Sequence, residues 1–142
     1  MTTRFKKIGL WGHLGETGVA EPALEIFTQL RVLGLDVLIP DQENIPTGFR
    51  NATCVPADQL GAEVDLIIAV GGDGTMLHAA RRSATYSVPL LGVNRGRLGF
   101  LTDISPELMA ETIGAVISGD YIAETRLMLQ AKITSTNKTL GP

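Results

Sequence analysis

The segment VDLIIAVGGDGTMLH, residues 64–78, combines three features that together predict an α/β architecture. Residues 65–70 form a nearly continuous apolar run, which is typical of a parallel strand buried on both faces. Gly71 and Gly72 interrupt this run, and the pattern over 75–84 is typical of a helix. A strand, a glycine turn and a helix build phosphate sites in α/β proteins, because glycine allows close backbone approach and the helix N-terminus offers free N–H groups.

Asp73 lies within this turn, where its negative charge would repel a bound phosphate. The carboxylate therefore indicates a second task, such as accepting a proton from a hydroxyl that attacks the phosphate. Two structural interpretations compete with this one. Asp-Gly pairs are common in ordinary turns, and an aspartate that precedes a helix also serves as an N-cap. Capping and catalysis are compatible with each other.

The rest of the chain predicts alternating strands and helices on both sides of this segment. We expect strands over 8–11, 35–39, 88–93 and 121–134, helices over 20–33 and 105–118, and a long loop over 41–59 with a short strand near 53–55. Ser105 is the expected cap of the last helix. This order predicts a doubly wound α/β fold with a mostly parallel sheet, in which ligands bind at the carboxyl ends of strands. Glycine-rich loops at 71–75 and 94–103 leave two such ends and should border one cleft.

Composition narrows the class of protein. The chain has 142 residues, 44% of them hydrophobic, and a net charge of −3, which suits one domain and disfavours nucleic-acid binding by bulk charge. Its single cysteine, Cys54, excludes an internal disulfide and predicts a reducing, cytoplasmic setting. No apolar run reaches the length of a membrane span, and the N-terminus does not fit a signal peptide. The glycines of 12–18 are spaced G-x-x-G-x-x-G, which is not a dinucleotide fingerprint.

Two motifs resemble one enzyme family. GGDGT at 71–75 resembles a motif that NAD kinases share with diacylglycerol and sphingosine kinases and, more distantly, with phosphofructokinases. GVNRGRLGFLTD at 92–103 looks like a segment specific to NAD kinases, and YIAETRLML at 121–129 is also similar to that family. The resemblance extends from the first strand to about Lys132 and is closest to the bacterial type. It implies a Rossmann-like N-terminal domain.

The resemblance also implies a reaction, in which the γ-phosphate of ATP moves to the adenosine ribose 2′-hydroxyl of NAD and gives NADP. Asp73 would contact and activate that hydroxyl. Mg²⁺ would accompany ATP, with polyphosphate as an alternative donor and no metal held by the chain itself. The full-length parent would be a homo-oligomer. The other implied site residues are Gly71, Gly72, Gly74 and Thr75 for the turn and the phosphate, Leu77, Leu98 and Phe100 for the NAD site, and Asn94, Gly96 and Gly99 for the second loop.

The resemblance implies, in addition, a division into domains. Residues 1–134 would form the N-terminal domain, and 135–142 a tail where a β-rich C-terminal domain would begin. The family's downstream Asn-Glu motif is absent, because Asn137 is followed by Lys138. We therefore expect a fragment with little or no activity of its own.

Two other functions compete with the NAD kinase interpretation. A lipid kinase of the diacylglycerol type shares the first motif but not the second. A non-catalytic nucleotide-binding or assembly module would not need the carboxylate of Asp73. Arg95 and Arg97 are interpreted either as solvated loop charges or as contacts to ATP phosphates.

Overall fold

A computed structural model describes residues 4–96, 99–102 and 104–134. These residues form a five-stranded sheet in which every pair of neighbouring strands is parallel. The order across the sheet is β3-β2-β1-β4-β5. The strands are β1 (Lys7–Trp11), β2 (Asp36–Pro40), β3 (Thr53–Val55), β4 (Leu66–Gly71) and β5 (Leu90–Asn94). The predicted α/β fold with a parallel sheet is confirmed, and so is the short strand at 53–55.

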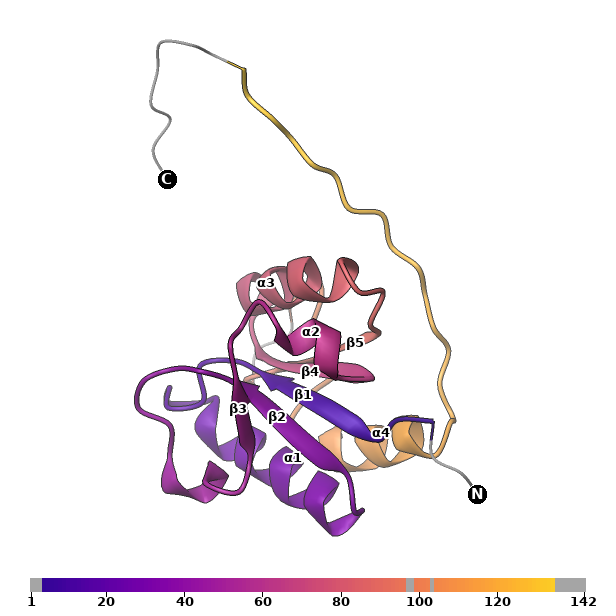
Figure 1. Ribbon diagram of the computed structural model, residues 1–142. Helices are drawn as coiled ribbons and strands as arrows, with labels where there is room; N and C mark the ends of the chain where they lie inside the picture. The colour runs from indigo at the N-terminus through magenta and orange to yellow at the C-terminus, as the bar shows by residue number, and fades with distance from the viewer. Residues whose placement is uncertain (1–3, 97–98, 103, 135–142) are drawn as a thin grey trace.

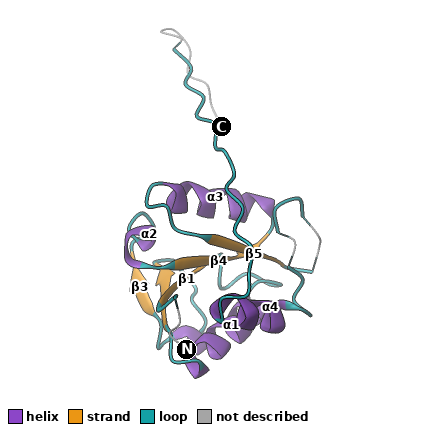
Figure 2. Ribbon diagram, turned by 90° about the vertical axis from the view of Figure 1, so that its right-hand side faces the viewer, coloured by secondary structure: helices purple, strands orange, loops and turns teal. Residues whose placement is uncertain are grey.

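Helices cover both faces of this sheet (Figure 1). One face carries α1 and α4, and the other carries α2 and α3, as the turned view in Figure 2 also shows. Their bounds are α1 (Ala20–Val32), α2 (Leu60–Glu63), α3 (Asp73–Ala84) and α4 (Met109–Ile117), with a short 3₁₀ helix at Thr47–Phe49. The longest of them has 13 residues, and no helix in the described ranges has the length and hydropathy that crossing a membrane requires.

The central strand β4 explains why its sequence is apolar at every position. Leu66, Ile68 and Val70 belong to the core beneath α1 and α4. Ile67 and Ala69 belong to the separate core beneath α2 and α3. Because successive side chains of a strand point to opposite faces, a strand covered on both sides must be apolar throughout.

The strand order places a topological switch point between β1 and β4. The chain moves from β1 outward through β2 to β3, and then returns to the other side of β1 as β4. In open α/β sheets, the crevice at the carboxyl ends of strands beside such a point is where ligands bind. The loops after β1, β4 and β5 all leave this end of the sheet.

Two predicted features are wrong. Residues 121–134 form no strand within the described part of the chain, and after Tyr121 the chain runs away from the domain (Figure 1), with Leu127 and Leu129 94% and 96% exposed. Alternation shows that one face of a segment is apolar, but a strand also needs a hydrogen-bonded neighbour. Ser105 does not cap α4 either. Its carbonyl accepts from the Leu108 N–H at 3.1 Å and closes a turn, so the helix begins only at Met109.

Candidate active site

The first glycine loop connects the end of β4 to the start of α3. A side chain on Gly71 would place its Cβ 2.5 Å from the Thr75 Oγ1, so close packing requires glycine at this position. At Gly72 and Gly74, by contrast, an added Cβ would meet no atom within 4 Å. The fold therefore does not account for the absence of side chains there, and the backbone of these two glycines is open to a ligand.

Asp73 is the first residue of α3, and Gly72 occupies the N-cap position. The Asp73 side chain makes no cap hydrogen bond, so the N-cap interpretation is wrong. Instead, the backbone N–H of Phe100 donates to Oδ2 at 3.0 Å, and that of Leu101 donates to Oδ1 at 2.9 Å. These two bonds tie the first glycine loop to the second.

The hydrogen bonds also set the charge of this carboxylate. Those from Leu101 and Phe100, with a smaller one from Thr102, hold the pKa of Asp73 below its usual value. Hydrogen bonds to the charged form favour that form, so Asp73 is ionised at neutral pH. A carboxylate offers about four lone-pair positions, and two remain for another donor such as an alcohol.

Gly99 lets the second loop approach this carboxylate. An added Cβ at Gly99 would collide with Asp73 Oδ1 and would lie 2.6 Å from Thr102 Oγ1. The Gly99 N–H donates to the Thr102 carbonyl at 3.3 Å, which closes the loop on itself. Close approach, and not backbone strain, explains the glycine at this position.

The buried side chain of Asn94 holds the same loop through two hydrogen bonds. Its side chain is 2% exposed, and its amide donates to the Thr102 carbonyl at 3.2 Å and accepts from the Gly96 N–H at 2.9 Å. A buried side chain with both ends occupied shapes the loop and does not face a ligand. Gly96 has a positive φ of 104°, which a residue without Cβ adopts easily.

Two apolar side chains on either side of Asp73 are exposed. Phe100 is 99% exposed on the second loop, and Leu77 is 54% exposed on α3. Phe100 is therefore not a core residue. Exposed apolar groups beside a polar site are suited to cover a ligand or a further part of the protein.

The third loop, after β1, reaches the second one through an ion pair that the sequence did not predict. Arg95 Nη1 lies 2.7 Å from Glu16 Oε1, and both side chains remain nearly half exposed. The loop after β1 is itself braced by Gln42, which accepts from the Leu14 N–H at 2.8 Å and donates to the Gly12 carbonyl at 3.1 Å. No spacing rule connects Glu16 to Arg95, because only the strand order brings their loops together.

The structure thus brings Gly71, Gly72, Asp73, Gly74 and Thr75 together with Asn94, Gly96, Gly99 and Phe100 at one edge of the sheet. Leu98 and Arg97 lie outside the described residues. In residues 4–96, 99–102 and 104–134, no group of three or more His, Cys, Asp or Glu side chains is placed to hold a metal ion.

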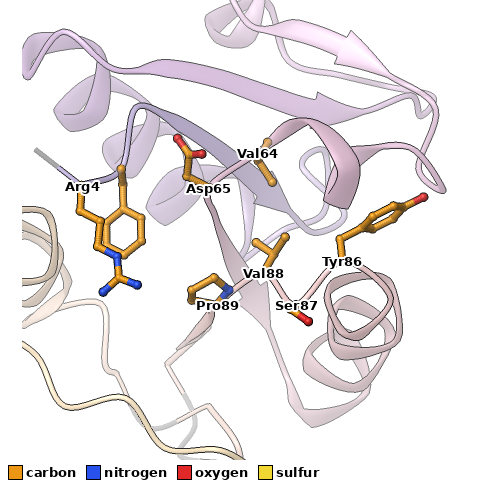
Figure 3. A pocket seen from close by; sticks show the side chains of 8 residues that line it. Arg4, Val64, Asp65, Tyr86, Ser87, Val88 and Pro89 are labelled. Carbon is orange, nitrogen blue, oxygen red and sulfur yellow. The ribbon is translucent and has the colours of Figure 1, made fainter.

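A second hollow lies at the opposite, amino ends of β1, β4 and β5 (Figure 3). Its two charged side chains, Asp65 and Arg4, both make hydrogen bonds within the protein. Asp65 Oδ2 accepts from the backbone N–H groups of Lys6 and Lys7 at 2.8 and 2.9 Å, and Arg4 donates to the Tyr121 hydroxyl at 2.9 Å. These contacts tie the N-terminal segment to β4 and to Tyr121.

Comparison with known proteins identifies a family whose members resemble this chain along most of its length. Residues 9–121 match the family model of the ATP-NAD kinase N-terminal domain. The chain is 39% identical to the NAD kinase of Nitrosospira multiformis, with 98% of this chain and 47% of that protein covered. It is 42% identical to the NAD kinase of Aromatoleum aromaticum, with 94% of this chain and 45% of that protein covered. The chain spans about half the length of these curated relatives.

A solved structure shares the fold. The structure of yeast NADH kinase complexed with NADH superposes with a TM-score of 0.64 at 21% sequence identity. The superposition covers 81% of this chain and 36% of that one. The likeness shows that the two proteins share this α/β fold.

Proposed function

Because the chain belongs to the NAD kinase family, we propose that it supplies the Asp73-bearing part of an enzyme that phosphorylates NAD. The reaction transfers the γ-phosphate of ATP to the adenosine ribose 2′-hydroxyl, giving NADP and ADP. The observation that carries this proposal is the Asp73 carboxylate, which is ionised, tied to both glycine loops and still able to accept a hydrogen bond.

Asp73 orients the attacking hydroxyl. The ribose O–H donates to a free lone pair of the carboxylate, which aims the oxygen at the γ-phosphorus and receives the proton as the new bond forms. A low pKa makes this carboxylate a weak base. Phosphoryl transfer passes through a loose transition state in most analyses, so orientation contributes more than early deprotonation does.

Gly72 and Gly74 hold the donor phosphate. Their backbone lies at the N-terminus of α3, where N–H groups and the helix dipole favour an anion. Because neither glycine has an atom within 4 Å of an added Cβ, a phosphate group has room to approach. ATP enters as its Mg²⁺ complex, and the ion neutralises phosphate charge.

Leu77 and Phe100 line the NAD site. Both are exposed apolar side chains on the two elements that flank Asp73, which suits contact with the flat face of a nucleotide base. Leu98 completes the set that the resemblance implies. The relatives are about twice as long as this chain, so we propose that a second domain closes the site. A homo-oligomeric, cytoplasmic enzyme, with ATP or polyphosphate as donor, is part of the same proposal.

The test is product formation by a chimera in which this chain replaces the matched part of the Nitrosospira multiformis NAD kinase. The chimera, Mg²⁺ and ATP are incubated with NAD in one tube and diacylglycerol in another, and products are identified by mass. NADP in the first tube alone is the expected result. Phosphorylated lipid in the second tube, without NADP in the first, would contradict the proposal. The 142-residue chain assayed alone measures how much the second domain contributes.

A further inference from the structure

Thr102 holds a polar atom that the site described above leaves unused. The residue is 0% exposed, and its Oγ1 is the one buried side-chain oxygen or nitrogen without a hydrogen-bond partner in the described part of the chain. Leaving a hydroxyl unpaired in a protein interior is unfavourable, so each such case calls for a physical reason.

The surroundings of this hydroxyl suggest the reason. Thr102 Oγ1 and Asp73 Oδ1 both press against Gly99, since an added Cβ there would meet both oxygens and would lie 3.1 Å from Asp73 Cγ. The backbone N–H of Thr102 also contributes, after those of Leu101 and Phe100, to lowering the pKa of Asp73. The threonine therefore flanks the carboxylate with both its backbone and its side chain.

The hydroxyl cannot touch a substrate directly, because its oxygen is fully covered. It therefore acts on the protein atoms around it, and the Asp73 carboxylate, which borders the same Gly99, is a charged acceptor on that side. A threonine hydroxyl carries one donor that rotates freely, and an ionised carboxylate has unused lone pairs. The structure shows no bond between the two groups, so joining them requires a local adjustment of Thr102 or Asp73.

We propose that Thr102 is a positioning residue for Asp73, and that its hydroxyl donates a hydrogen bond to the Asp73 carboxylate. This bond, added to those from the second loop, orients the carboxylate toward the acceptor hydroxyl. On this proposal, the buried hydroxyl is explained by its bond to the Asp73 carboxylate and not by packing.

Titration of Asp73 tests this inference without any assay of activity. The carboxyl carbon of Asp73 is followed by NMR against pH in the 142-residue chain and in Thr102→Val, which removes the hydroxyl and keeps the shape. We expect the pKa of Asp73 to rise by about half a unit to one unit, since a donor to the charged form is lost. Thr102→Ser keeps the hydroxyl and should restore the lower value.

Controls separate positioning from packing. Thr28→Val removes a hydroxyl on α1, on the other face of the sheet, which donates to the Leu24 carbonyl at 2.9 Å, and it should leave the Asp73 titration unchanged. If valine is not accommodated at 102, Thr102→Ala gives the same comparison. An unchanged Asp73 titration in the hydroxyl-free variants, with or without a higher thermal midpoint, would overturn the inference.

A kinetic arm links this inference to the proposed function, on which its catalytic meaning rests. In the chimera, Thr102→Val should lower kcat about tenfold with little change in KM for NAD, and Thr102→Ser should recover most of it. A shifted titration with unchanged kcat would contradict the role of Asp73 in the proposed function. An unshifted titration would contradict the role of Thr102.

Discussion

At the scale of single residues, Asp73 shares its two oxygens between the protein and a reacting group. Each oxygen already accepts one backbone N–H from the second loop, at 2.9 and 3.0 Å. These bonds keep the carboxylate charged and fix its direction, and they leave about two lone-pair positions, one for the proposed Thr102 bond and one for a reacting hydroxyl. The same side chain therefore holds two loops together and presents an acceptor to the crevice.

A substitution at Gly74 distinguishes a purely structural turn from a phosphate-binding site. Gly74→Ala should leave the thermal midpoint unchanged or raise it by a few degrees, because alanine favours the helix and meets no atom within 4 Å. Activity of the chimera should fall at least about tenfold, because the methyl group occupies the surface that phosphate approaches. Calorimetry and initial rates measure the two effects.

Gly114→Ala is the matched control for this substitution. Gly114 lies in α4, where an added Cβ would be 3.8 Å from its nearest neighbour, so the variant should keep both stability and activity. Full activity in Gly74→Ala would show that the open backbone at 74 is not used by the donor.

The sequence alone led to Asp73 and to the glycines around it, because a carboxylate inside a glycine turn is chemically unusual. It did not lead to Thr102 or to the pairing of Glu16 with Arg95. Thr102 belongs to the quoted GVNRGRLGFLTD segment, yet its hydroxyl becomes notable only when the structure shows it buried and unpaired. Contacts of this kind depend on the path of a loop, which local pattern does not encode.

At the scale of elements, Asp65 ties the start of β1 to the start of β4. Its carboxylate accepts from the N–H groups of Lys7 and Lys6, which hold the pKa of Asp65 below its usual value. A lowered folded pKa stabilises the fold above the unfolded pKa, and this contribution is lost as pH falls through the folded value.

Asp65→Asn should accordingly cost about 1 kcal/mol of unfolding free energy at pH 7, after allowance for screening at an exposed site. The difference from the wild-type chain should shrink below about pH 4, as the wild-type carboxylate is protonated. Urea unfolding at a series of pH values measures it. Asp58→Asn, at another exposed aspartate, is the control, and a difference that persists unchanged at pH 2 would contradict this role for Asp65.

Elements with a strong pattern were predictable, and short or context-dependent ones were not. The apolar run at 65–70 predicted β4 because burial on both faces leaves a clear signal. The four-residue helix α2 at Leu60–Glu63 was missed, since one turn has no periodicity to detect. At 121–134 a strand was predicted where the structure has none, because alternation carries no information on whether a neighbouring strand exists.

That segment gives a prediction about local stability. Residues 122–134 have no regular structure, and their apolar side chains, including Ile122, Leu127 and Leu129, are exposed. Limited trypsin digestion of the chain should therefore cut after Arg126 and Lys132 well before it cuts after Arg81 or Arg82 within α3. Mass spectrometry of the early fragments decides the order, and first cuts within α3 would show that 122–134 is protected.

At the scale of the whole molecule, the candidate site lies at one edge of the five-stranded sheet. The core on both faces of the sheet is closed, while Phe100 and Leu77 remain exposed beside Asp73. The curated relatives are NAD kinases about twice as long as this chain. We therefore propose that this chain specifies the fold and that a second domain completes the site.

The most direct measurement compares Asp73→Asn with the unaltered chimera, using NADP formation for turnover and calorimetric titration for NAD binding. The amide keeps the shape of the side chain but loses its charge, so turnover should fall by about 10²–10⁴-fold while the Kd for NAD changes little. Near-normal turnover in Asp73→Asn would contradict the assignment of this carboxylate to the acceptor hydroxyl.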